Sequence, residues 1–218
     1  MRHYLEILRP FNGIMSAIAV LIGALIAGGT IGTTVYLGML SVFLISGAGM
    51  VLNDYYDVEI DRTNKPNRPI PSGKIKLQTA LAYSVVLFVI GIGITYFINM
   101  ETAITAIIAS ALLIGYAARL KKTMLMGNVV VSAMVALTFI YGGMIFNNWI
   151  ILLPVALLAF LSNMAREIYK TIDDALGDQK YQVNSVAIRL GVVHARLLAN
   201  IFTISAVIFS FLPYFLGI

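Results

Sequence analysis

The sequence is dominated by long, unbroken apolar runs that short polar segments separate. A helix needs about 20 apolar residues to cross the hydrocarbon core of a bilayer, and most of these runs approach that length. Strands fit poorly, because the runs do not alternate and an open sheet edge in lipid would leave backbone groups unpaired. We therefore expect an all-α, polytopic transmembrane bundle with about seven spans: Phe11–Gly28, Tyr36–Leu52, Leu77–Ile98, Thr102–Ala118, Met124–Phe146, Trp149–Met164 and Leu197–Leu216.

The composition agrees with a membrane protein and excludes several functional classes. The 218 residues are 60% hydrophobic and 11% charged, which is outside the range of soluble domains. Because the chain has no cysteine, disulfides and thiolate metal sites are excluded. We find no Walker loop, dinucleotide fingerprint or nucleophile–His–Asp pattern. A nucleic-acid partner is not expected, because the basic residues are interleaved with acids and tethered to the membrane.

The placement of charge predicts the orientation. All fifteen Lys and Arg residues lie at the N-terminus or in the segments after the second, fourth and sixth apolar runs. Under the positive-inside rule, these segments face the cytoplasm. Nine of the ten acidic residues share that side, Glu101 being the exception. We expect an integral protein of the cell membrane whose N-terminus and active site are cytoplasmic.

An acid-rich stretch, Asn53–Gly73, follows the second apolar run. It holds four of the ten acidic residues at a membrane boundary, where a carboxylate is costly unless a cation partners it. If the second helix continues here, Asp54, Asp57 and Asp61 lie at i, i+3 and i+7, within about 60° of one face. Magnesium prefers such oxygen ligands, completed by water and substrate phosphates. The spacing predicts half of a metal–diphosphate site, with Glu59 facing solvent.

A second acidic set lies in the longest segment without an apolar run, Asn163–Arg196. Its members are Glu167, Asp173, Asp174 and Asp178. Because four helices return the chain to the same face, we expect the two acidic segments to meet across the bundle. Asp174 and Asp178 are spaced i, i+4, although Gly177 can break that geometry. We predict that these two aspartates also bind metal.

The sequence alone leaves two roles open for the basic and amide side chains. Basic residues beside the acids can neutralise a diphosphate, or they can serve only as topology signals. This ambiguity applies to Arg62, Lys65, Arg68, Lys121 and Lys122. Asn12 is either an interfacial polar residue or a substrate contact. Asn128 is expected near the cytoplasmic mouth of the fifth span.

Two motifs carry a family resemblance that covers essentially the whole chain. The run Asn53-Asp54-x-x-Asp57-x-x-x-Asp61, with Arg62, Asn64-Lys65-Pro66, Arg68-Pro69-Ile70 and Ser72-Gly73, resembles the first aspartate-rich motif of the UbiA superfamily of intramembrane prenyltransferases. The segment Arg166-Glu167-Ile168-x-Lys170-x-x-x-Asp174-x-x-Gly177-Asp178, then Arg189-Leu190-Gly191, resembles the second motif in its archaeal digeranylgeranylglyceryl phosphate synthase form. Tyr116 with Lys121, and Gly127-Asn128 leading to Gly142-Gly143, are similar to intervening signatures.

The resemblance implies a helical bundle around a central cavity that opens to the cytoplasm and to lipid. It implies Mg²⁺ as cofactor, geranylgeranyl diphosphate as donor and the hydroxyl of geranylgeranylglyceryl phosphate as acceptor, with an archaeal ether lipid as product. Lys121, with Arg62 or Lys65, would stabilise the departing diphosphate. The implied site comprises metal ligands Asp54, Asp57, Asp61, Asp174 and Asp178, catalytic residues Lys121, Arg62 and Tyr116, and substrate contacts Asn12, Asn53, Lys65, Arg68, Lys122, Asn128, Arg166 and Lys170.

Two departures from the family pattern stand out. Family members usually have nine membrane helices, so residues 1–218 are expected to form one prenyltransferase domain without the last helical hairpin. Thr171 stands where the archaeal branch often has another aspartate, which predicts one metal ligand fewer.

Other functions remain open. Within the same class, the prenyl group could go to an aromatic acceptor, as in quinone biosynthesis, because the donor motifs are shared. A cation transporter would place its acids near the bilayer midplane, whereas these acids cluster at one face beside bases. A non-catalytic membrane scaffold is the third alternative.

Overall fold

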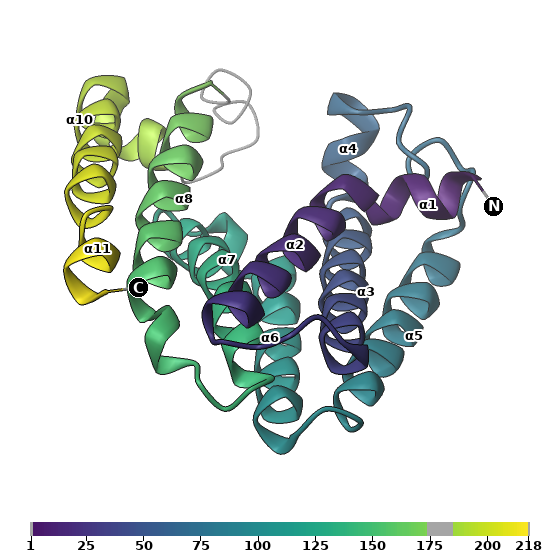
Figure 1. The fold of residues 1–218 in the computed structure, drawn as a ribbon. Coiled ribbons are helices and arrows are strands. Elements are labelled where there is room, and N and C mark those ends of the chain that lie inside the picture. Colours follow the sequence, from purple (N-terminus) through teal and green to yellow (C-terminus); the bar gives the residue numbers. More distant parts are fainter. Residues whose placement is uncertain (1, 174–184, 218) are drawn as a thin grey trace.

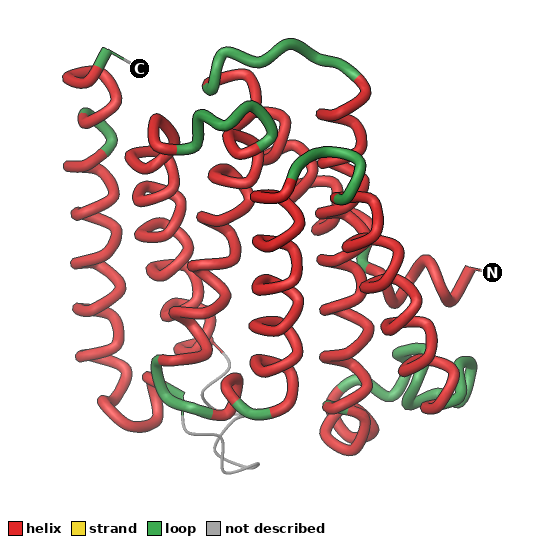
Figure 2. The backbone as a smooth tube through the Cα atoms, turned by 90° about the horizontal axis from the view of Figure 1, so that it is seen from below, coloured by secondary structure: helices red, strands yellow, loops and turns green. Residues whose placement is uncertain are grey.

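The structure, a computed structural model, describes residues 2–173 and 185–217. Within these ranges the chain forms only helices and the turns and loops between them (Figure 2). This confirms the predicted all-α class. The helices are α1 (Arg2–Leu8), α2 (Pro10–Ile26), α3 (Thr33–Tyr56), α4 (Val58–Asn64), α5 (Leu77–Thr95), α6 (Met100–Ala118), η1 (Leu120–Lys122), α7 (Met126–Met144), η2 (Ile150–Leu152), α8 (Leu153–Asp173), α10 (Val186–Phe209) and α11 (Leu212–Leu216).

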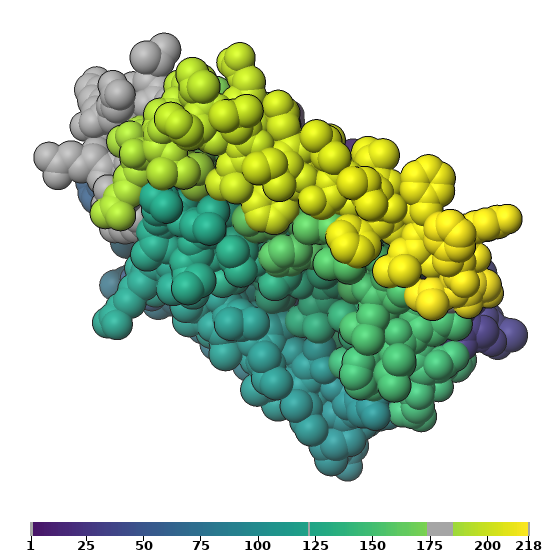
Figure 3. All heavy atoms as spheres, turned by 90° about the vertical axis from the view of Figure 1, so that its left-hand side faces the viewer, coloured from purple at the N-terminus to yellow at the C-terminus, as the bar shows by residue number. Residues whose placement is uncertain are grey.

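The number of membrane spans agrees with the prediction. In the described ranges, 6 helices are long and apolar enough to cross a bilayer, and the bent pair α1 and α2 brings the number to 7. Large apolar side chains cover the outward faces of these helices, among them Val89, Ile107 and Ile201. In water such surfaces would drive aggregation, but in a bilayer they face lipid. Figure 3 shows α10 and α11 running as one continuous ridge across an outer face.

The helix ends differ most from the predicted spans at the charged side of the bundle. The sixth span was predicted to stop at Met164, but α8 continues to Asp173. The seventh was predicted to begin at Leu197, but α10 begins at Val186. An apolar run marks where a helix leaves the hydrocarbon, whereas its backbone hydrogen bonds continue into the polar zone. Conversely, α5 ends at Thr95 rather than Ile98, because tight turns replace the helix there.

Glycine allows α2 and α7 to pack at backbone distance. A Cβ on Gly142 would lie 2.2 Å from the carbonyl oxygen of Val20, and one on Gly23 would lie 2.1 Å from that of Phe139. No side chain fits at either position, and small residues of this kind allow close helix contact in lipid. This contact joins the N-terminal helices to the second half of the bundle.

The two acidic segments lie at the same end of the molecule. Figure 1 shows α4 and the last turns of α8 at one end of the bundle. The prolines between α4 and α5 lie in irregular turns over residues 65–76, and α5 begins at Leu77, where the third span was predicted to begin. The four-helix spacing therefore brings both segments to one end, as expected from the sequence.

Candidate metal and diphosphate site

The first acidic segment is built on a break between α3 and α4. Asp57 has non-helical backbone angles, φ −92° and ψ 2°. Helical hydrogen bonds nevertheless span the break: the Asp57 N–H donates to the Asn53 carbonyl at 3.0 Å, and the Asp61 N–H donates to the Asp57 carbonyl at 2.8 Å. The prediction of a single stripe was conditional on the helix continuing. In the structure the helix breaks at Asp57, and the three aspartates form two groups with different partners.

Asp54 and Asp61 form the first group, which is buried and bound by arginine. The Asp54 Oδ1 atom accepts from Arg9 Nη2 at 2.5 Å and from Arg68 Nη1 at 3.2 Å. The same Arg68 nitrogen donates to Asp61 Oδ2 at 2.5 Å. The side chains of Asp54 and Asp61 are only 4% and 6% exposed. A buried carboxylate needs such partners, because leaving it unpaired is strongly destabilising.

Asp57 forms the second group with a lysine from a distant part of the chain. Lys121 Nζ donates to Asp57 Oδ1 at 2.6 Å and to Asn53 Oδ1 at 3.2 Å. The lysine lies on η1, against which α7 packs closely: a Cβ on Gly127 would lie 3.2 Å from the Cα atom of Lys121. The structure thus brings together Asn53, Asp57 and Lys121, three residues that the sequence assigned to the site.

Arg9 was not predicted as a site residue, although it is the closest partner of Asp54. The ion-pair cluster therefore consists of three carboxylates, Asp54, Asp57 and Asp61, and three cations, Arg9, Arg68 and Lys121. The available signal was an arginine immediately before the proline that opens the first span. Its reach across 45 residues to Asp54 is a tertiary contact that spacing along the chain does not indicate.

The α8 side of the site is described only as far as Asp173. Glu167 is buried, accepting from Arg166 Nη1 at 2.7 Å, with Lys170 Nζ at 3.9 Å. Both cations are largely exposed at the rim. Tyr116 on α6 lies close enough to Glu167 and to Asp57 for both charges to act on its hydroxyl.

The end of the second motif contains two predicted metal ligands and Thr171. The predicted metal ligands Asp174 and Asp178 lie outside the described residues. The Thr171 hydroxyl donates to the Ile168 carbonyl of its own helix at 2.7 Å. The position where the archaeal branch often has an aspartate is thus occupied by a group bonded to its own backbone.

Several predicted contacts are not gathered into the cluster. Arg62 Nη1 binds Glu59 at 3.0 Å, and both side chains are exposed. Lys65 is exposed after α4, and Asn12 is exposed on α2. The side chain of Lys122 lies outside the described part of the structure. Among the described side chains, Arg9, Arg68 and Lys121 bind the carboxylates of the cluster, whereas Asn12, Arg62 and Lys65 make no recorded contact with them.

Asn128 belongs to a polar row between α7 and α8. Its carbonyl accepts from the Ser132 hydroxyl at 2.7 Å, and that hydroxyl accepts from Asn163 Nδ2 at 3.1 Å. The Asn128 Nδ2 atom is buried and has no protein partner in the described residues. The row begins in the first turn of α7, which packs on η1, and continues along α7 to Ser132.

A groove of about 340 Å³ lies elsewhere, between α8 and α10, with mainly small and apolar side chains along it. It is lined by Leu158, Ser162, Ala165, Thr203, Ala206, Val207 and Ser210, none of which contacts the carboxylates. The central cavity implied by the family resemblance therefore stays a prediction.

The donor chemistry of the first segment fits magnesium. Carboxylate oxygens are the hard ligands that Mg²⁺ takes, usually one or two per ion. In the described residues, however, no three acidic or histidine side chains converge on one point, because each aspartate turns toward a cation. An ion that binds Asp54 Oδ1, Asp61 Oδ2 or Asp57 Oδ1 replaces a guanidinium or ammonium nitrogen at that oxygen.

Known proteins match this chain over most of its length. Residues 16–218 match the UbiA prenyltransferase family. The chain is 44% identical to a digeranylgeranylglyceryl phosphate synthase of Methanosphaera stadtmanae, covering 100% of this chain and 80% of that one. It is 38% identical to a digeranylgeranylglyceryl phosphate synthase of Sulfurisphaera tokodaii, covering 98% and 79%.

Solved structures show the same fold. A digeranylgeranylglyceryl phosphate synthase structure superposes with a TM-score of 0.86 at 37% identity, covering 99% of this chain and 78% of that one. A UbiA homolog from Archaeoglobus fulgidus bound to DMAPP and Mg²⁺ superposes with a TM-score of 0.79 at 20% identity, covering 94% and 75%. On the strength of the family match and these full-length relatives, the chain belongs to the UbiA prenyltransferase family.

Proposed function

We propose that this protein transfers a geranylgeranyl group from geranylgeranyl diphosphate to the free hydroxyl of geranylgeranylglyceryl phosphate, forming the ether bond of an archaeal membrane lipid. The observation that carries the proposal is the buried cluster of three carboxylates and three cations at one end of an apolar bundle. Its support comes from relatives up to 44% identical that bear the name digeranylgeranylglyceryl phosphate synthase.

In this proposal Asp54, Asp57 and Asp61, with Asp174 and Asp178, hold Mg²⁺ and the donor diphosphate. Bound magnesium supplies positive charge to the leaving diphosphate. The bond between the allylic carbon and the diphosphate oxygen breaks, and the electron pair leaves with the diphosphate. The acceptor hydroxyl oxygen then bonds to the allylic carbon and loses its proton.

Lys121 is the cation best placed to stabilise the leaving group. Its side chain is 11% exposed and is fixed by Asp57 and Asn53. A preoriented, partly desolvated ammonium stabilises developing negative charge without reorganising. We assign Tyr116 and Arg62 supporting catalytic roles on the strength of the motif alone.

The remaining predicted residues are proposed as substrate contacts. Arg166 and Lys170 are exposed cations beside Glu167, suited to an incoming phosphate. Lys65, Arg68 and Lys122 surround the diphosphate in this scheme, and Asn12 and Asn128 contact the substrates deeper in the bundle. The charge distribution along the sequence supports a cytoplasmic position for the site and for the N-terminus.

The test is a product assay with purified protein, magnesium and geranylgeranyl diphosphate. Either geranylgeranylglyceryl phosphate or 4-hydroxybenzoate is offered as acceptor, and products are identified by mass. We expect the ether lipid phosphate alone, and no product after chelation with EDTA. A prenylated 4-hydroxybenzoate as the main product would overturn the acceptor assignment, and no product from either acceptor would overturn the activity.

A further inference from the structure

Arg9 has an unusual backbone conformation at the junction of α1 and α2. Its φ of 49° and ψ of 64° lie in the left-handed region, which only a few per cent of residues other than glycine adopt. The two helices bend by 52° at this point. The bend directs the guanidinium to Asp54 Oδ1 at 2.5 Å, with Met50 Sδ at 3.8 Å.

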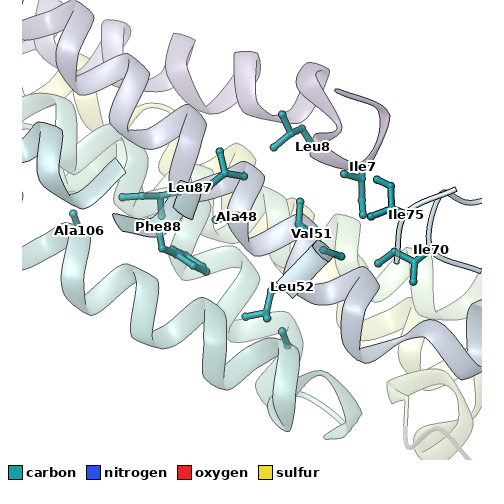
Figure 4. Packing of buried hydrophobic residues seen from close by; sticks show 13 residues of the cluster. Ile7, Leu8, Ala48, Val51, Leu52, Ile70, Ile75, Leu87, Phe88 and Ala106 are labelled. Carbon is teal, nitrogen blue, oxygen red and sulfur yellow. The ribbon is translucent and has the colours of Figure 1, made fainter. Parts of the chain in front are cut away.

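Arg9 and Arg68 reach the same carboxylate from two segments that pack on each other. Figure 4 shows Ile7 of α1 beside Ile75 and Ile70, which belong to the turns that carry Arg68. All three isoleucines are buried. Asp54 is thus held between two arginines whose backbones are fixed by a common apolar contact.

Magnesium and these arginines compete for the Asp54 carboxylate, and at Oδ1 for the same atom. A magnesium ion lies about 2.0–2.1 Å from each oxygen that it binds, and Arg9 already donates to Asp54 Oδ1. The three aspartates and the three cations balance in charge, so a divalent ion enters a neutral cluster. Coordination through Oδ1 of Asp54 therefore displaces a guanidinium group, which stays tethered within reach.

We infer that Arg9 has two successive partners at this site: it neutralises Asp54 before metal binds, and it donates to the diphosphate once metal has displaced it. The identity of the anion rests on the proposed function. A guanidinium presents a planar fork of N–H donors that matches phosphate oxygens. Arg9 is thus a competitor of the metal and a ligand of the anion.

The two roles predict effects of opposite sign, which a purely structural role does not. Glycine adopts positive φ freely, so Arg9→Gly removes the cation and retains the bend. Without anion, its loss should strengthen metal binding, since a competing positive charge is gone. With metal bound, its loss should weaken diphosphate binding. A residue that only shaped the bend would alter both affinities in the same direction or neither.

The experiment measures binding without turnover, in purified full-length protein. Mn²⁺, a paramagnetic substitute for Mg²⁺, is titrated by EPR without anion, and inorganic diphosphate is then titrated at saturating Mn²⁺. For Arg9→Gly we expect Mn²⁺ to bind about three- to tenfold more tightly, and diphosphate about tenfold more weakly. Arg9→Lys should restore part of the diphosphate affinity, since it restores the charge but not the fork.

Arg2→Gln is the matched control, because it removes a positive charge from the exposed face of α1. It should leave both affinities unchanged. Should Arg9→Gly fail to fold, Arg9→Asn provides the same test, because asparagine also tolerates positive φ. Unchanged or weaker Mn²⁺ binding in the folded variant would overturn the inference. Neither titration uses a prenyl donor or a lipid acceptor, so failure of the product assay alone would overturn only the proposed function.

Discussion

The two acidic segments meet the same problem, negative charge at a membrane boundary, in different ways. On the α3–α4 side, Asp54 and Asp61 are buried and neutralised by Arg68 of the same segment, and Asp54 also by Arg9 from the start of the chain. On the α8 side, Glu167 is buried, but its cations Arg166 and Lys170 are exposed at the rim. The first segment is closed around its own charges, whereas the second presents positive groups to the surroundings.

This difference assigns different tasks to the two sides. In a closed, neutral cluster, a divalent ion has to compete with the Arg and Lys side chains that already pair with the carboxylates. The affinity for the ion therefore depends on how strongly those side chains are bound. Exposed cations pair weakly with their own carboxylate, because solvent screens them, and remain available to an incoming phosphate. We therefore expect substitutions on the α3–α4 side to affect chemistry most, and those on the α8 side to affect mainly substrate binding.

The largest effect is expected for Asp54→Asn. It removes a proposed metal ligand and the negative charge that Arg9 and Arg68 share, so product formation should fall by about 100-fold or more. Initial rates measure the change. Glu59→Gln is the control, because Glu59 pairs only with exposed Arg62 in the described residues, and should change the rate by less than about twofold. A variant at Asp54 with more than a tenth of wild-type activity would remove the distinction between the two sides.

Next comes Lys121→Met, which should lower kcat by about 10- to 100-fold by removing a fixed cation from the leaving group. Lys121→Arg should recover part of this loss. Arg119→Gln serves as the control, because it removes an exposed positive charge just before η1. It should behave like wild type. A change confined to KM would show that Lys121 contributes to binding and not to the chemical step.

On the α8 side, Glu167→Gln should have a smaller effect, about tenfold or less, and it should appear mainly in the KM for the lipid phosphate acceptor. The reason is that Arg166 and Lys170 lose their shared carboxylate but stay solvated. Steady-state kinetics in which both substrate concentrations are varied separate the change in KM for the acceptor from the change in kcat. A loss of kcat as large as that of Asp54→Asn would contradict the proposed division of tasks.

The smallest effect on chemistry is expected where the halves of the bundle join. Gly142→Ala forces α2 and α7 apart, since the new Cβ would meet the Val20 carbonyl oxygen at 2.2 Å, and should destabilise the protein by about 1–3 kcal/mol. Thermal unfolding in detergent measures this. Gly93→Ala is the matched control, because a Cβ there meets nothing within 4 Å. Equal melting temperatures for the two variants would show that the close contact is dispensable.

The sequence predicted the parts of the fold that depend on local properties. Apolar runs indicated the spans, and the third run correctly predicted the start of α5 at Leu77. The runs missed the polar last turns of α8 and first turns of α10, because hydropathy reports burial in lipid and not helix length. The motifs indicated which carboxylates cluster. They did not indicate the break at Asp57 or the outward turn of Arg62 to Glu59.

Arg9 shows most clearly what the sequence could not supply. Its contact with Asp54 depends on the 52° bend between α1 and α2 and on the packing of Ile7 against the turns after α4. Both are tertiary features that bring together residues far apart in the chain. The pairing of Lys121 with Asp57, 64 residues apart, has the same origin.

The central claim is that both acidic segments hold one magnesium–diphosphate unit. The most direct test is the affinity for geranylgeranyl diphosphate, measured with magnesium or with EDTA for wild type, Asp54→Asn and Asp174→Asn. We predict tight binding only for wild type with magnesium, and a loss of about tenfold or more for either variant. Equal affinity in EDTA, or unchanged affinity after removal of either aspartate, would contradict the claim.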